Sequence, residues 1–109
     1  MADSPVFDWV AEALEEETSF STIQARGTVR LVLKEAGISP FELTVAQLEV
    51  LIDRLFHAAL VTRGVAPERA TGVCTALAEG LRARASRGDL EAHGESAHDV
   101  FARLGRRRR

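Results

Sequence analysis

The strongest constraint on the fold is the regular placement of residues that begin helices. Two segments, Ser21–Gln24 and Thr44–Gln47, match the capping box, in which a hydroxyl and a side-chain amide satisfy free backbone N–H groups at a helix start. A third start is predicted where Ser4 precedes Pro5, and Pro67 opens a fourth helix, because proline is favoured at the first helical position.

The predicted helix ends are marked by glycine. Gly37, Gly64 and Gly88 each follow a helical pattern, where a left-handed residue commonly terminates a helix. Ile38 and Val65 come directly after the first two of these glycines, as expected for the hydrophobic contact that closes such a cap. Starts and ends together predict helices over residues 5–17, 22–36, 45–63 and 67–87.

Apolar residues recur at helical spacing in each predicted helix, and no segment alternates with the period of a strand. The connections are short, which favours antiparallel neighbours. We therefore predict an all-α chain, with residues 1–88 forming a compact four-helix bundle or a related antiparallel helical packing. Residues 89–109 are predicted to be a flexible C-terminal segment with a basic tail. Within it, Val100, Phe101 and Leu104 indicate a candidate fifth helix over 96–104.

Charge and targeting signals limit the classes of function. The net charge is −2, and it falls near −6 without the four arginines at 106–109, so the body of the chain is a poor ligand for polyanions. No secretory signal and no apolar run of about 20 residues are visible. A single cysteine excludes an internal disulfide. These features predict a cytoplasmic protein without a membrane span, and the scarcity of lysine and tyrosine is typical of a GC-rich bacterial gene.

The helix predicted over 22–36 carries an apolar face in addition to its core face. The second face consists of Phe20, Ile23, Gly27 and Leu31. One interpretation is a central helix that contacts two neighbours, and the other is a free surface on which a partner helix docks. Under either interpretation Gly27 predicts a close backbone approach, because a glycine within a helix costs about 1 kcal/mol relative to alanine.

Three basic residues, Arg26, Arg30 and Lys34, lie along the same helix at intervals of four. They are candidates for binding an acidic partner, or else they pair with carboxylates of the first helix, for which we expect Glu12, Glu15 and Glu16. The acidic end of that first helix opposes its dipole, so a basic group is expected close to residues 15–17.

No arrangement of reactive residues predicts catalysis, a metal or a cofactor. Asp53 and His57 are spaced as a surface pair, with no nucleophile or third ligand placed beside them by the sequence. His93 and His98 are five residues apart, which does not match the helical spacing of a zinc pair. Cys74 lies on the apolar face of its helix and is predicted to be a core residue.

Small residues line one flank of the helix over 67–87: Gly72, Ala76, Gly80 and Ala83. They predict tight packing on a neighbouring helix, with a homodimer seam as the alternative. Sequence-specific DNA binding is disfavoured, because the connection over 37–44 is longer than the turn of a helix-turn-helix motif and the following helix carries no basic reading face.

The function predicted from these features is a non-catalytic helical module for protein–protein interaction or regulation. The partner, expected to be another helix, would dock on Phe20, Ile23, Gly27 and Leu31, while Arg26, Arg30 and Lys34 would set the register. The alternative is a nucleic-acid-associated protein that uses the basic tail together with Arg82, Arg84 and Arg87. A third possibility is a subunit or fragment of a larger enzyme system, whose activity would appear only after mixing with a partner.

Overall fold

The computed structural model describes residues 3–88, and this part of the chain is an all-α bundle of five helices. The helices are α1 (Pro5–Glu17), α2 (Thr22–Ala36), α3 (Val45–Arg54), α4 (Phe56–Thr62) and α5 (Pro67–Arg87). None of them is both long enough and apolar enough to cross a bilayer. The helix predicted over 96–104 and the basic tail lie outside the described residues.

The predicted helix starts are confirmed in atomic detail. The Ser4 hydroxyl accepts a hydrogen bond from the backbone N–H of Phe7 at 3.1 Å. Both capping boxes are complete, since each hydroxyl accepts from the backbone N–H three residues on, and each glutamine side chain accepts from the backbone N–H of the cap residue. These bonds satisfy donors that have no partner within the helix.

The predicted helix ends are confirmed as well. Gly37, Gly64 and Gly88 all have positive φ angles, which glycine adopts without steric penalty. The N–H of Ile38 donates to the Leu33 carbonyl at 2.9 Å, and that of Val65 donates to Leu60 at 3.0 Å. Each of these bonds runs from the residue after the glycine to the carbonyl five positions earlier, which is the bond that defines a Schellman motif and completes the predicted cap.

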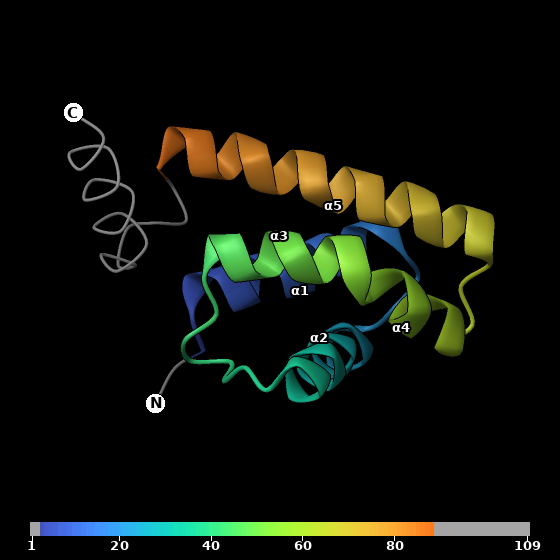
Figure 1. The fold of residues 1–109 in the computed structure, drawn as a ribbon. Coiled ribbons are helices and arrows are strands. Elements are labelled where there is room, and N and C mark those ends of the chain that lie inside the picture. The colour runs from blue at the N-terminus through green and yellow to red at the C-terminus, as the bar shows by residue number, and fades with distance from the viewer. Residues whose placement is uncertain (1–2, 89–109) are drawn as a thin grey trace.

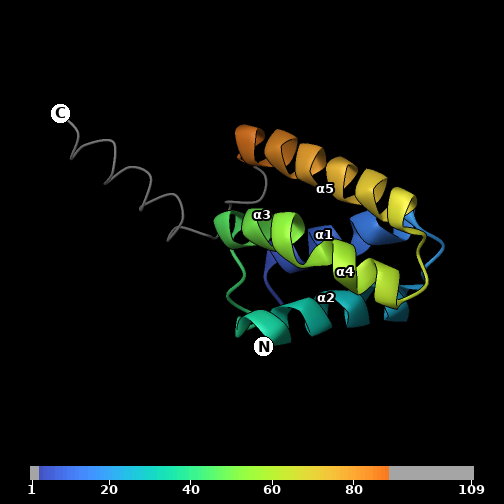
Figure 2. The ribbon, with the colours of Figure 1, turned by 45° about the vertical axis from the view of Figure 1, so that its right-hand side comes forward.

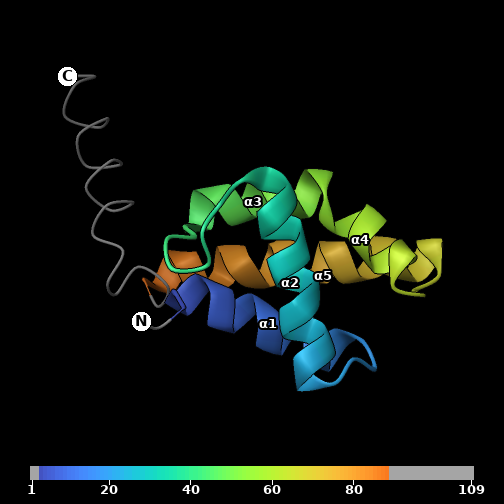
Figure 3. The same cartoon turned by 90° about the horizontal axis from the view of Figure 1, so that it is seen from below.

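The helices form three layers (Figure 1). α1 and the α3–α4 pair lie beside each other in the middle layer, α5 covers one side of it, and α2 covers the other (Figure 2). Viewed from below, α2 crosses the helices of the middle layer steeply instead of running antiparallel to them (Figure 3). α2 and α5 are therefore the two outer layers, and each has a face directed away from the core.

The core occupies the space between the three layers. Its largest fully buried side chains are aromatic and aliphatic: Phe7, Phe56, Leu14, Leu33, Leu43, Leu48, Leu60, Leu77 and Leu81. The two polar residues that are buried within residues 3–88 are both hydrogen-bonded, Ser4 as described above and Thr28 through its hydroxyl to the Gln24 carbonyl at 2.8 Å. Neither residue therefore carries the penalty of an unsatisfied buried polar group.

The helix predicted over 45–63 is instead two helices. The chain bends at Leu55, which has φ −119° and ψ −28°, and neither proline nor glycine marks the position. The apolar periodicity is uninterrupted across the bend, so the pattern alone predicts one helix. Because α3 packs on α5 while α4 packs on both α5 and α2, the bend allows one apolar face to serve two neighbours.

The close backbone approach predicted at Gly27 is wrong, because a Cβ built there would meet nothing within 4 Å. The close approach occurs at Gly80 on α5. A Cβ at that position would lie 3.0 Å from Cζ2 of the half-buried Trp9. Tight packing on the small-residue flank of α5 is thus confirmed at Gly80, whereas Gly72 faces open space.

We expect Gly80→Val to lower the free energy of unfolding by about 1–3 kcal/mol, because the added methyl groups must displace the Trp9 ring. Gly72→Val is the matched control: it makes the same substitution in the same helix at an exposed position. Urea denaturation of both variants measures the difference. Equal stability of the two would show that the Trp9 contact does not restrict residue 80.

Candidate functional site

The apolar surface left uncovered on α2 is the first candidate site. We call Phe20, Ile23, Gly27 and Leu31 the α2 ridge; the last three lie on the side of α2 opposite its buried residues, whereas Phe20 precedes the helix and packs partly against the core. Ile23 is 84% exposed, and the other three are half-buried. Within residues 3–88, α2 packs on two neighbours, α1 and α4, but Ile23 is left exposed.

The basic residues of α2 are largely committed within the chain. Arg26 contacts Asp3 at 2.6 Å and Asp8 at 3.1 Å, and Arg30 contacts the same Asp3 oxygen at 3.3 Å. Both guanidinium groups also lie over the Phe7 ring, 4.8 and 5.2 Å from its centroid. These arginines therefore hold the start of α1 against α2.

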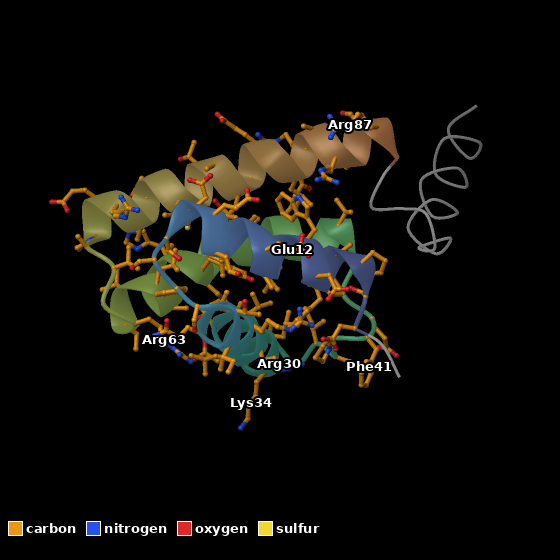
Figure 4. All side chains as sticks on the ribbon, turned by 180° about the vertical axis from the view of Figure 1, so that it is seen from behind. Glu12, Arg30, Lys34, Phe41, Arg63 and Arg87 are labelled. Atoms are coloured by element: carbon orange, nitrogen blue, oxygen red, sulfur yellow. The ribbon has the colours of Figure 1, made fainter. Side chains whose placement is uncertain are left out.

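The expected pairing of these arginines with Glu12, Glu15 and Glu16 is wrong because of the crossing of the helices. The start of α1 passes α2 near Arg26, whereas antiparallel helices would have brought the acidic end of α1 there. The third basic residue, Lys34, makes no ion pair within the described part of the chain, and its side chain points away from the body (Figure 4).

The basic group expected near the end of α1 is present, and it comes from α5. The Arg69 guanidinium donates to the Glu17 carbonyl at 3.1 Å, which places a positive charge at the negative end of the α1 dipole. The Glu15 carboxylate accepts from the Thr22 hydroxyl at 3.0 Å. Hydrogen bonds from α5 and from the start of α2 thus hold the end of α1 in place.

The second candidate site is an open groove of about 490 Å³ between α3 and α5, which we call the α3/α5 groove. The α3–α4 side contributes Glu49, Ile52, Asp53 and His57, and α5 contributes Thr71, Cys74, Thr75, Ala78 and Arg82. Apolar atoms of Ile52, Cys74 and Ala78 lie between the two polar rims. The groove therefore combines an apolar floor, one acidic wall and one arginine.

The spacing of the α5 residues is the sequence signal that could have revealed this groove. Positions 71, 75, 78 and 82 follow the helical repeat and form one stripe beside the core face. Which helix faces that stripe was not predictable from the pattern, because the facing residues come from a separate segment at least 14 positions earlier in the chain.

Asp53 and His57 share the groove, but no hydrogen bond joins them. The bend at Leu55 separates them, and Nε2 of His57 lies 3.1 Å from the Pro67 carbonyl. A carbonyl only accepts, so Nε2 must carry the hydrogen in this contact. Asp53 has only a long, exposed contact of 3.9 Å with Arg54. The predicted surface pair of Asp53 and His57 is therefore not formed. His57 instead bonds to the Pro67 carbonyl and connects α4 to the start of α5.

Cys74 was predicted to be a core residue, and its position differs from that prediction. The thiol is half-buried at the floor of the α3/α5 groove. Partial burial raises the pKa of the Cys74 thiol, because desolvation disfavours the thiolate. Glu49 and Cys74, which the sequence did not place near His57, thus line the same groove, but a thiol kept protonated is a poor nucleophile.

A further groove lies on the opposite side of α5, between it and α1, and is lined in part by Trp9, Glu12, Glu16, Arg84 and Arg87. Glu12 and Arg87 both lie on this side of the molecule (Figure 4). Arg82 belongs to the α3/α5 groove, so the three arginines of α5 are divided between two surfaces, each with carboxylates beside them.

No protein-family model, no curated protein and no solved structure matches this chain. Within residues 3–88, no group of three or more His, Cys, Asp or Glu side chains is arranged to hold a metal ion. His93 and His98 lie outside these residues.

We expect Asp3→Ala to lower the free energy of unfolding by about 1 kcal/mol, because it removes the carboxylate shared by Arg26 and Arg30. The Asp3 side chain is only 13% exposed, so solvent screens these pairs less than it does those at the open surface. Glu79→Ala removes an exposed carboxylate that makes no ion pair among the described residues and is the control, with an expected change within about 0.5 kcal/mol. Thermal denaturation at low and high salt measures both; an equal, negligible effect of the two variants would contradict the role of Asp3.

Proposed function

We propose that this protein is a non-catalytic helical module that binds another protein through the α2 ridge. The observation that supports the proposal is the 84% exposure of Ile23, a large aliphatic side chain at the second position of an otherwise consistently patterned helix. Exposed apolar surface next to a basic rim is typical of a protein-binding face.

The shape of the ridge favours a helical partner. Residues 23, 27 and 31 are spaced by four, so they form a single straight stripe along α2. The absence of any neighbouring atom within 4 Å of a Cβ at Gly27 leaves a shallow step between Ile23 and Leu31. A partner helix would place its own side chains there and bring its backbone close.

The charges on the ridge narrow the chemistry of the partner. Lys34 lies one turn after Leu31, on the row of basic residues beside the ridge, and makes no ion pair among the described residues, whereas Arg26 and Arg30 are already neutralised by Asp3 and Asp8. The fitting partner is therefore an amphipathic helix with an acidic residue beside its apolar stripe. A face of one helix buries little surface, so the complex belongs to the small, transient class of interfaces.

We expect Ile23→Asp to abolish partner binding while the free energy of unfolding changes by no more than about 0.5 kcal/mol, because the side chain is exposed. Val50→Asp is the matched control: Val50 is also exposed, at 55%, but lies on α3. Affinity capture from the source lysate with the parent and both variants, repeated with nuclease, measures the effect. A partner lost equally with both variants, or with neither, would contradict binding at the ridge.

Gly27→Leu provides a second and independent test. No atom of residues 3–88 lies within 4 Å of a Cβ built at this position, and leucine is a better helix former than glycine, so we expect stability to rise by up to about 1 kcal/mol. A helix docked on the ridge would meet the new side chain, and binding should weaken by at least about tenfold. Unchanged affinity in a titration with the captured partner would show that the partner does not approach Gly27.

The rival function, association with nucleic acid, is distinguished by the same capture. Its partner would disappear on nuclease treatment or on deletion of residues 105–109, and would show a steep dependence on salt. The division of Arg82, Arg84 and Arg87 between two carboxylate-lined grooves disfavours a continuous basic face on α5.

A further inference from the structure

The α3/α5 groove holds charged groups that the described part of the chain leaves uncommitted. Neither Glu49 nor Arg82 makes an ion pair within residues 3–88, and Asp53 has only its exposed contact with Arg54. The groove on the other side of α5 differs, because Arg84 and Arg87 in its lining are engaged in interactions. An amphipathic segment with basic residues therefore finds a better match in the α3/α5 groove.

The sequence that follows α5 contains a segment with this chemistry. Val100, Phe101 and Leu104 share one side of the helix predicted over 96–104, and Arg103 and the arginines at 106–109 follow the apolar residues. Such a short helix is marginal in water unless another surface buries its apolar side. The apolar floor of the groove offers such a surface, and the carboxylates of Glu49 and Asp53 complement the arginines.

The length of the groove and the length of the chain after α5 are also compatible with this match. The groove runs along α5 from Arg82 to Thr71, which is about 16 Å at 1.5 Å per residue, and a nine-residue helix is about 14 Å long. The described chain ends at Gly88, about 9 Å beyond Arg82 along the axis of α5. Residues 89–95 span at most about 23 Å when extended, which is enough to reverse direction and reach the nearer end of the groove.

We propose that residues 96–104 dock in the α3/α5 groove of their own chain, with Phe101 on the apolar floor above Cys74 and Arg103 toward the acidic wall. A tether of seven residues gives this segment an effective concentration that an ordinary free partner does not reach. The docked segment covers the Cys74 thiol.

The accessibility of Cys74 reports directly on this arrangement, because it is the only cysteine of the chain and lies in the groove. The test compares the rate at which an aromatic disulfide reagent modifies the full chain, Phe101→Asp and Phe101→Ala at one fixed pH. Ala102→Asp is the charge-matched control, since residue 102 falls on the opposite side of the predicted helix. Far-UV circular dichroism verifies that each variant keeps its helices.

We expect both Phe101 variants to react about tenfold faster than the parent, as when a segment docked in about 90% of molecules is released, and Ala102→Asp to react at the parent rate. Equal rates for the parent and both Phe101 variants would overturn the proposal. A parent rate that falls as the protein concentration rises would also overturn it, in favour of a second copy in the groove. Because this experiment does not involve the α2 ridge, its outcome does not depend on whether a partner protein binds at Ile23.

Discussion

The packing of the first turn of α1 against α2 is the contact on which the arrangement of the other helices depends. Phe7 is fully buried, and its ring is covered by the guanidinium groups of Arg26 and Arg30, which Asp3 and Asp8 hold in place. The backbone N–H of the neighbouring Ser4 donates to the Pro40 carbonyl at 3.0 Å, so the connection after α2 is fixed at the same point. A buried aromatic ring, a charge network and a backbone bond thus set the crossing of α1 and α2 together.

The crossing of α1 and α2 was not predictable from the sequence, whereas the ends of the helices were. Helix starts and ends depend on residues within four positions of each other, so Ser21, Thr44 and Gly37 located them correctly. The angle between helices depends on how side chains of distant segments interlock, and no local pattern encodes it. The assumption of antiparallel neighbours consequently gave the wrong carboxylates as partners of Arg26.

The same distinction between local patterns and tertiary packing applies to the two candidate sites. Ile23 was identified from the sequence because it belongs to a stripe on a single helix, although exposure of that stripe required knowledge that α2 is an outer layer. The α3/α5 groove was missed because it is shared by two helices and because the bend at Leu55, which has no proline or glycine to mark it, sets the direction of His57. At this bend, packing against α5 and α2 breaks the helix although the helical pattern of apolar residues continues.

The layer order has a consequence for how the molecule can be occupied. The α2 ridge faces outward on one side of the middle layer, and the α3/α5 groove lies on the other (Figure 1). A ligand on either surface leaves the other one sterically free, so two occupants can be present on one molecule without competing for space. Any influence of one on the other would have to pass through the interlocked side chains of α1, α3 and α4, and would require those side chains to have two alternative packings. In the absence of such alternatives, docking of residues 96–104 in the groove and of a partner on the α2 ridge, as proposed above, would be additive in free energy.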